Sequence, residues 1–353
     1  MPLSLSKQPL LGIVATIVVS IVSLVFISLF DFHTFAGWVS LILVCSVPVQ
    51  LIIGPFWHGT QPQFIADRAQ PVRGIGYMVF TLLIAVLMAQ TMFHVIGGAF
   101  GPPRPPVIMF SIFCVVVSFW VIIIWGAWPI SYIKQPMVAG ILLYLFIHLL
   151  AWLLFNFLFN FSFMSGAPIY IESIDPKGLF NAWQVLVFGV TSVSALFIVL
   201  SFELWPLTLS PAVMQQPVQR IVWSLYVLVL AAAMFFVGTR VLNMDVVVYL
   251  TVVPVSIIFG GIIVLNMLQK SLFSQLRQPV KGVANVIVVL LVGHLLYRIY
   301  LFALPLVSGK LSSGPPAYDV EIWLASAMLA VTFPFLIVVA DFFQFKLVGK
   351  ADS

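Results

Sequence analysis

Charge is what this chain has least of. Its 353 residues include 15 Lys or Arg and 10 Asp or Glu, so charged residues make up 7% and hydrophobic residues 63%. A soluble domain carries about 25% charged residues to cover its surface. The composition therefore excludes an ordinary soluble globular protein and indicates a chain surrounded by lipid.

The sequence also lacks the motifs of familiar enzymes. It contains no Walker motif, no Gly-rich dinucleotide loop, no H-E-x-x-H and no G-x-S-x-G. The two cysteines, Cys45 and Cys114, lie in apolar stretches and are not at C-x-x-C spacing, so we interpret them as small hydrophobic residues. We expect no metal site, because no carboxylate–His cluster occurs, and no enzymatic activity of the chain by itself.

Long apolar runs recur from end to end. Runs of about 20 residues cross a hydrocarbon layer of roughly 30 Å as helices, whereas barrel strands would be about 10 residues of alternating character. The first run is too long for a signal-peptide core, so we expect it to be retained. The sequence therefore predicts an all-α, polytopic membrane protein, one integral domain over 1–353, with spans near 10–31, 36–56, 73–99, 106–128, 137–164, 180–204, 219–243, 245–268, 280–305 and 319–343.

A Gln-Pro pair precedes every second span. Proline suits the first turn of a helix, because its missing N–H would have no helical partner there. We interpret the recurrence as five tandem two-helix hairpin repeats, at approximately 8–56, 70–128, 135–204, 216–268 and 278–343. The pairs are Gln8-Pro9, Gln70-Pro71, Gln135-Pro136, Gln216-Pro217 and Gln278-Pro279.

This layout of five tandem hairpins resembles that of the slow anion channel and tellurite-resistance/dicarboxylate transporter family. In that family the kinked, pore-lining helices are the odd-numbered ones. Here Pro48, Pro254 and Pro334 lie within even-numbered spans. The resemblance is one of layout, and no functional residue is carried over from it. Because kinked helices pack against protein or a cavity, we expect the even-numbered spans to be the inner ones.

The basic residues are unevenly placed. Cytoplasmic loops of membrane proteins carry an excess of Lys and Arg, and the Gln-Pro side of this chain is the richer one. We therefore predict a cell (inner) membrane protein with both termini cytoplasmic, and the scattered positive charge does not indicate nucleic-acid binding. The side predicted to be cytoplasmic carries Lys7, Arg68, Arg73, Lys134, Arg220, Lys270, Arg277, Lys281, Lys346 and Lys350, against Arg104, Lys177, Arg240 and Lys310 on the other side.

Four of the repeats place a polar residue at one level. Counting from each Gln-Pro pair, His33, His94, Asn160 and Arg240 lie 24 or 25 residues further on, close to the outer surface. One interpretation is a set of interfacial polar side chains that reach the headgroups. The other is a polar outer mouth that attracts an anion or a polar solute.

Ionisable residues inside spans are few, and each is a functional candidate because burying it in lipid is costly. Glu203 and Asp341 lie near the cytoplasmic ends of spans 6 and 10, where a buried carboxyl could carry a proton. His148 and His294 have similar predicted depths and could be axial ligands of a b-type haem, or could hold a quinone. Arg298 follows His294 by one helical turn.

These patterns favour a multi-pass transporter or channel for a small polar or anionic solute. The solute would enter past the outer polar residues and leave near Glu203 and Asp341. A second hypothesis is an integral subunit of a redox or oxygenase complex that holds haem or quinone at His148 and His294, and a third is an assembly subunit without a ligand. The expected partners are the lipid bilayer, the solute, and other copies or subunits, which the loop at 169–177 would contact.

Overall fold

The computed structural model of the protein describes residues 7–269 and 271–346. Lys270 and Lys350, two of the basic residues predicted to be cytoplasmic, lie outside this part. Ten helices in the described residues are long and apolar enough to cross a membrane, which confirms the prediction of a ten-span, all-α protein. Spans 1 to 10 are Leu10–Ile27, Phe32–Phe56, Val72–Val95, Pro105–Ile124, Pro136–Leu158, Ala182–Ser201, Val218–Val241, Val246–Met267, Val280–Ser308 and Asp319–Phe342.

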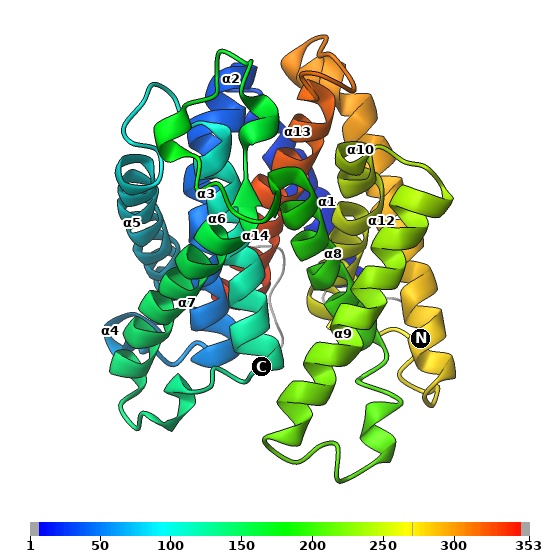
Figure 1. Ribbon diagram of the computed structural model, residues 1–353. Coiled ribbons are helices and arrows are strands. Elements are labelled where there is room, and N and C mark those ends of the chain that lie inside the picture. Colours follow the sequence, from blue (N-terminus) through cyan, green and yellow to red (C-terminus); the bar gives the residue numbers. More distant parts are fainter. Residues whose placement is uncertain (1–6, 270, 347–353) are drawn as a thin grey trace. The chain divides into compact units, whose positions relative to one another are not determined.

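The described residues contain fourteen numbered α-helical segments, of which all but α4 lie within the spans (Figure 1). They are α1 Leu10–Ile27, α2 Phe32–Thr34, α3 Ser40–Leu51, α4 Gln63–Ala66, α5 Val72–Val95, α6 Pro105–Phe119, α7 Pro136–Leu158, α8 Ala182–Ser201, α9 Val218–Phe236, α10 Val246–Leu250, α11 Ser256–Ile262, α12 Val280–Ser308, α13 Asp319–Ala325 and α14 Phe333–Ile337. Two short strands, β1 Phe159–Asn160 and β2 Phe180–Asn181, pair in parallel and tie together the ends of the loop after span 5.

Spans 2, 4, 8 and 10 are composite helices. Single π-helical turns interrupt or end them, because a proline or a local insertion disturbs the regular backbone ladder. Pro254 lies within one π turn, and Pro334 lies two residues after the end of another. The π-helical stretches in these spans are Phe35–Val39, Ile52–Phe56, Trp120–Ile124, Thr251–Val255, Ile263–Met267, Ser326–Thr332 and Val338–Phe342.

The chain forms two compact units. Unit 1 comprises 1–30 and 191–353, and unit 2 comprises 31–190. In unit 2, α3 packs against α5 and α6, and α6 packs against α7 (Figure 1). In unit 1, α11 packs along α12, and α1 packs against α12 and α14. The first span of the chain thus packs against the last three spans.

Burial separates the even-numbered spans from the odd-numbered ones. In the 18-residue windows of spans 2, 4, 6, 8 and 10, 61–78% of the residues are buried. In those of spans 1, 3, 5, 7 and 9, 17–44% of the residues are buried. The even-numbered spans are therefore the interior helices, as their mid-span prolines predicted. The odd-numbered spans present apolar side chains outward, as expected of helices that face lipid.

All five even-numbered spans end with left-handed backbone. The residues with positive φ are His58 and Gly59, Gly126 and Ala127, Glu203 and Leu204, Gln344 and Phe345, and Gln269, whose successor lies outside the described residues. Each even-numbered span ends, and each odd-numbered span begins, on the side that carries the Gln-Pro pairs. We call that end of a span its Gln-Pro end and the opposite end its far end.

The Gln-Pro pairs also share their geometry. At four of the five, the proline precedes the helix with ψ between −10° and −3°, and at the fifth Pro136 is the first residue of α7. The side chains of Gln70 and Gln278 accept hydrogen bonds from the backbone N–H groups of Gly74 and Gly282, at 3.2 and 3.0 Å. These glutamines therefore cap helices, because the first N–H groups of a helix have no partner within it.

Candidate functional site

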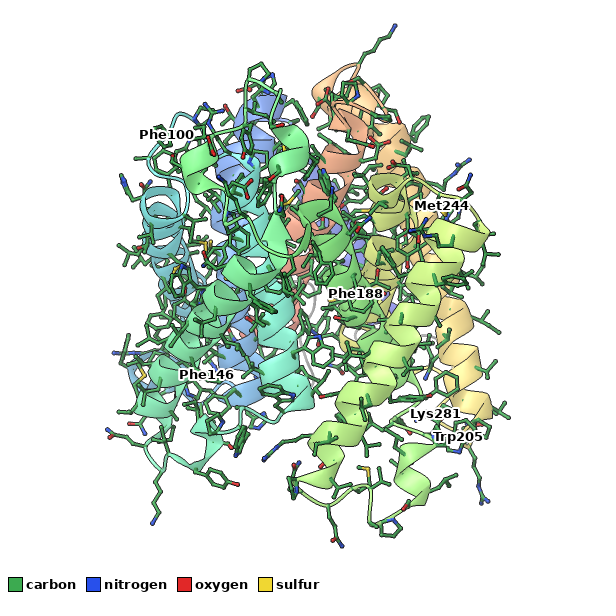
Figure 2. All side chains as sticks on the ribbon, in the orientation of Figure 1. Phe100, Phe146, Phe188, Trp205, Met244 and Lys281 are labelled. Carbon is green, nitrogen blue, oxygen red and sulfur yellow. The ribbon has the colours of Figure 1, made fainter. Side chains whose placement is uncertain are left out.

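Glu203 is engaged in an ion pair at the Gln-Pro end of unit 1. One carboxylate oxygen lies 2.5 Å from Lys281 Nζ, and the other accepts a hydrogen bond from Gln278 Nε2 at 3.3 Å. Figure 2 shows Lys281 beside Trp205 at this end of the unit. The Glu203 side chain is 42% exposed. The Glu203 carboxylate is therefore part of a partly exposed ion pair, and its position does not favour carrying a proton across the membrane.

Asp341 occupies a more enclosed position. It lies in the last π turn of span 10 and is hydrogen-bonded to the side chain of Asn266, near the end of span 8. The next residue of span 8, Met267, accepts a hydrogen bond from Gln8 Nε2 through its backbone oxygen at 3.1 Å. Asp341 thus lies where spans 1, 8 and 10 come together, and no cation is recorded beside it among the described residues.

The four far-end residues differ in their surroundings. His33, His94 and Arg240 are exposed, and His33 lies at the start of span 2 rather than at the end of span 1, because span 1 already ends at Ile27. His33 and His94 belong to neighbouring spans of unit 2, which are joined near these ends by contact of the Trp38 and Phe93 rings at 4.8 Å.

Asn160 holds the loop after span 5 together. Its amide donates to the backbone oxygen of Gly178 at 3.0 Å, and its carbonyl accepts from the Ser162 N–H at 2.9 Å. The Asn160 side chain therefore stabilises the loop. A contact with a solute would be a second role for the same side chain. Residues 137–164 were predicted as one span, but the helix ends at Leu158 because β1 and this loop begin there.

His294 and Arg298 lie on an exposed face of α12, with the His294 ring stacked near Tyr297 at 5.9 Å. α12 extends to Ser308 and has 29 residues, longer than predicted. At a rise of about 1.5 Å per residue, Arg298 is about 27 Å from the start of the helix, near the far edge of a 30 Å hydrocarbon layer. Its side chain can therefore reach the headgroups.

His148 is enclosed in unit 2. Its Nδ1 is 2.8 Å from the backbone oxygen of Tyr144, one turn earlier on α7. A carbonyl oxygen only accepts hydrogen bonds, so Nδ1 must carry a proton, and in the neutral imidazole Nε2 is then an unprotonated acceptor. Nε2 is buried and has no hydrogen-bond partner among the described residues. This is the tautomer that a metal-bound or haem-bound imidazole adopts.

The even-numbered spans share a buried polar position. We take the residue just before each left-handed pair as a reference point. In spans 2, 4, 6 and 10, the residue eleven positions earlier in the sequence is Ser, Cys or Thr. In span 8 a serine lies twelve positions earlier. Eleven residues correspond to about 16 Å, half the thickness of the hydrocarbon layer. All five side chains are at most 4% exposed: Ser46, Cys114, Thr191, Ser256 and Thr332. We call this set the mid-span polar layer.

In unit 1 this layer continues onto the outer helices. Tyr300 Oη of α12 lies 2.6 Å from Thr332 Oγ1, which in turn lies 2.8 Å from the backbone oxygen of Ala327. Ser20 and Ser23 of α1 face the same tyrosine hydroxyl. The sequence analysis did not single out these residues, because the two serines lie 277 or more positions before Tyr300.

Two far-end carboxylates were also missed. Glu321 of α13 is 5% exposed and accepts hydrogen bonds from Ser313 Oγ at 2.7 Å and from the Gly314 N–H. Asp245 caps α10 and accepts from Tyr318 Oη at 2.9 Å. Burial and this hydrogen bond raise the pKa of Tyr318 to about 12, so the phenol remains a donor at neutral pH. Both carboxylates anchor the loop between spans 9 and 10.

Across residues 7–269 and 271–346, no group of three or more His, Cys, Asp or Glu side chains could hold a metal ion. No protein-family model, no curated protein and no solved structure matches this chain. Any function must therefore be argued from the residues themselves.

Proposed function

We propose that this protein is a multi-pass membrane transporter or channel for a small polar or anionic solute, built from five tandem two-helix hairpins. The mid-span polar layer carries the proposal. Hydroxyl and thiol groups buried within apolar spans are costly unless they have hydrogen-bond partners. A layer of them on all five interior spans supplies uncharged polar contacts at the depth where a solute would otherwise meet only hydrocarbon.

The recurrent helix ends support the repeat. The same left-handed termination follows each interior span, and a Gln-Pro pair precedes each outer span. Spans 2, 4, 8 and 10 also carry π turns, and spans 2, 8 and 10 carry internal prolines, which free backbone carbonyls that can line a polar path. The path would begin near His33, His94, Asn160 and Arg240 at the far ends and finish near Asp341 and Glu203. Of these two carboxyls, Asp341 is the better proton carrier, because Glu203 is paired with Lys281.

The test uses the purified chain in proteoliposomes. Chloride and nitrate would be supplied as anions and glycerol as a neutral polar solute, with swelling followed by light scattering and currents measured in a KCl gradient. We expect flux of at least one of these solutes above that of empty vesicles. We also expect a loss of about tenfold in Thr332→Val, which removes one mid-span hydroxyl. Thr91→Val, at an exposed site on α5, is the matched control. No flux of any of the three solutes, or equal flux in the two variants, would contradict the proposal.

The second candidate is an integral subunit of a redox or oxygenase complex. His148 favours it, because a buried imidazole with a bare Nε2 fits an axial haem ligand or a quinone contact. A haem there would supply electron transfer, and His148 would hold the iron. His294, the other predicted ligand, lies on an exposed face of α12. A Soret band in the purified protein that is lost in His148→Ala would favour this candidate, and a colourless protein would remove its haem form.

A further inference from the structure

We infer that Tyr144 and His148 form a binding site for one hydroxyl group of a small neutral ligand. This site lies in unit 2 and goes beyond the transport function proposed above. It rests on two buried polar atoms of opposite hydrogen-bonding character that belong to neighbouring rings and have no partner among the described residues: Tyr144 Oη and His148 Nε2.

The two side chains are neighbours on α7. They are four residues apart, which places them on one face of the helix, and their ring centroids are 4.2 Å apart. Both are partly buried although span 5 as a whole is an outer helix. Their polar atoms are enclosed, which sets them apart from the apolar side chains that α7 exposes, such as Leu145 and Leu149.

The hydrogen bond of Nδ1 decides the chemistry of the site. Nδ1–H donates to the Tyr144 backbone oxygen, and an imidazole enclosed without a counter-charge is neutral, so Nε2 accepts. The Tyr144 hydroxyl carries a proton that it can donate. A hydroxyl group is the simplest ligand that satisfies both atoms at once, since its oxygen accepts from Tyr144 while its proton is donated to His148. A buried polar atom without a partner destabilises the protein, so a ligand that supplies both bonds is favoured.

The surroundings select a neutral ligand. The Tyr144 side chain lies within electrostatic range of the thiols of Cys45 and Cys114, each 1% exposed. Cys45 Sγ in turn contacts Met92 Sδ at 3.6 Å. Thiols and thioethers are polarizable and nearly apolar, and neither of the two salt bridges found among the described residues includes Tyr144, His148, Cys45 or Cys114. An ion would enter without a counter-charge, whereas an alcohol or phenol would not need one.

The test compares two probes that differ only at the hydroxyl. We would titrate the full chain in nanodiscs with 4-fluorophenol and with its methyl ether, 4-fluoroanisole, and follow the fluorine resonance. Because one hydrogen bond to a buried partner is worth about 1.4 kcal/mol, we expect the phenol to bind at least about tenfold more tightly than the ether. This preference should disappear in Tyr144→Phe and in His148→Leu. Tyr132→Phe and His294→Leu, both at exposed positions, should retain it.

A second measurement leaves both residues of the site in place. His33, His58, His94 and His294 are exposed. In a variant that replaces these four, His148 is the sole source of imidazole nitrogen signals in the nitrogen NMR spectrum. We expect a protonated Nδ1, a bare Nε2, and a shift of the Nε2 signal when 4-fluorophenol is added. Equal affinity for the two probes, or a protonated Nε2, would overturn the inference. Neither result depends on transport, so failure here is distinct from failure of the proposed function.

Discussion

At the scale of single residues, the closest contacts of this protein are made through glycine. A Cβ on Gly293 of α12 would lie 2.0 Å from the Ser256 backbone oxygen, and one on Gly260 would lie 2.1 Å from the Val289 backbone oxygen. The neighbours are backbone atoms, which cannot rotate away. Small residues at helix contacts are how membrane helices approach closely, since lipid provides little hydrophobic drive for their association.

Gly293→Ala should therefore destabilise the protein by about 1–3 kcal/mol, the usual cost of overpacking. Thermal unfolding in mild detergent, followed by intrinsic fluorescence, would measure the effect as a lowered midpoint. Gly166→Ala is the control, because nothing lies within 4 Å of its added methyl group and its φ is not in the left-handed region. A midpoint for Gly293→Ala as high as that of Gly166→Ala would show that spans 8 and 9 are not packed as closely as described here.

At the scale of elements, the loop between spans 5 and 6 is organised by a single carboxylate. Asp175 is 9% exposed and accepts hydrogen bonds from the N–H groups of Phe161 and Lys177, at 3.1 and 2.9 Å, and from Tyr170 Oη at 3.0 Å. A carboxylate that serves three donors from both halves of the loop holds them in one conformation. The small pocket beside it is lined by Tyr170, Asp175 and apolar side chains.

Asp175→Ala should release this loop. Each lost hydrogen bond to a charged acceptor is worth about 1.5–3 kcal/mol, so amide exchange over 159–181 should become at least tenfold faster, as measured by hydrogen–deuterium exchange. Glu172→Ala is the control, because Glu172 makes only an exposed ion pair, with Lys177. If the two variants exchanged equally, the loop would be held by its backbone pairing and not by Asp175.

The elements also show how far the sequence could predict this structure. Ten spans followed from hydropathy, because apolar length is a direct signal of a membrane crossing, and mid-span proline marked three of the five inner helices, spans 2, 8 and 10. The left-handed pairs that end the even-numbered spans could not be predicted, since Glu203, Leu204 and Gln344 are residue types that rarely adopt positive φ. The state of His148 depends on a hydrogen bond to its own helix, and the contact of Ser23 with Tyr300 joins opposite ends of the chain. Such contacts follow from packing, which cannot be predicted from the periodicity of apolar residues in the sequence.

At the scale of the whole molecule, the five tandem hairpins require an even number of crossings with every Gln-Pro end on one side of the membrane. Ten spans require both termini on the same side, and the excess of Lys and Arg at the Gln-Pro ends predicts that this side is cytoplasmic. Cys45 and Cys114 are each 1% exposed, so introduced cysteines can be labelled against a low background.

Single cysteines at exposed loop positions would test this topology in both units. Thr60→Cys and Gln215→Cys lie at Gln-Pro ends of units 2 and 1, and Ser165→Cys and Ala317→Cys lie at far ends of the same units. A membrane-impermeant maleimide added to intact cells should label only the far-end pair, and in inverted vesicles only the Gln-Pro pair. The five residues of the mid-span polar layer lie at one depth in the membrane only if all five interior spans have their Gln-Pro ends on the same side. Labelling of Thr60→Cys and Gln215→Cys from opposite sides would therefore remove both the repeat and the transport path proposed on it.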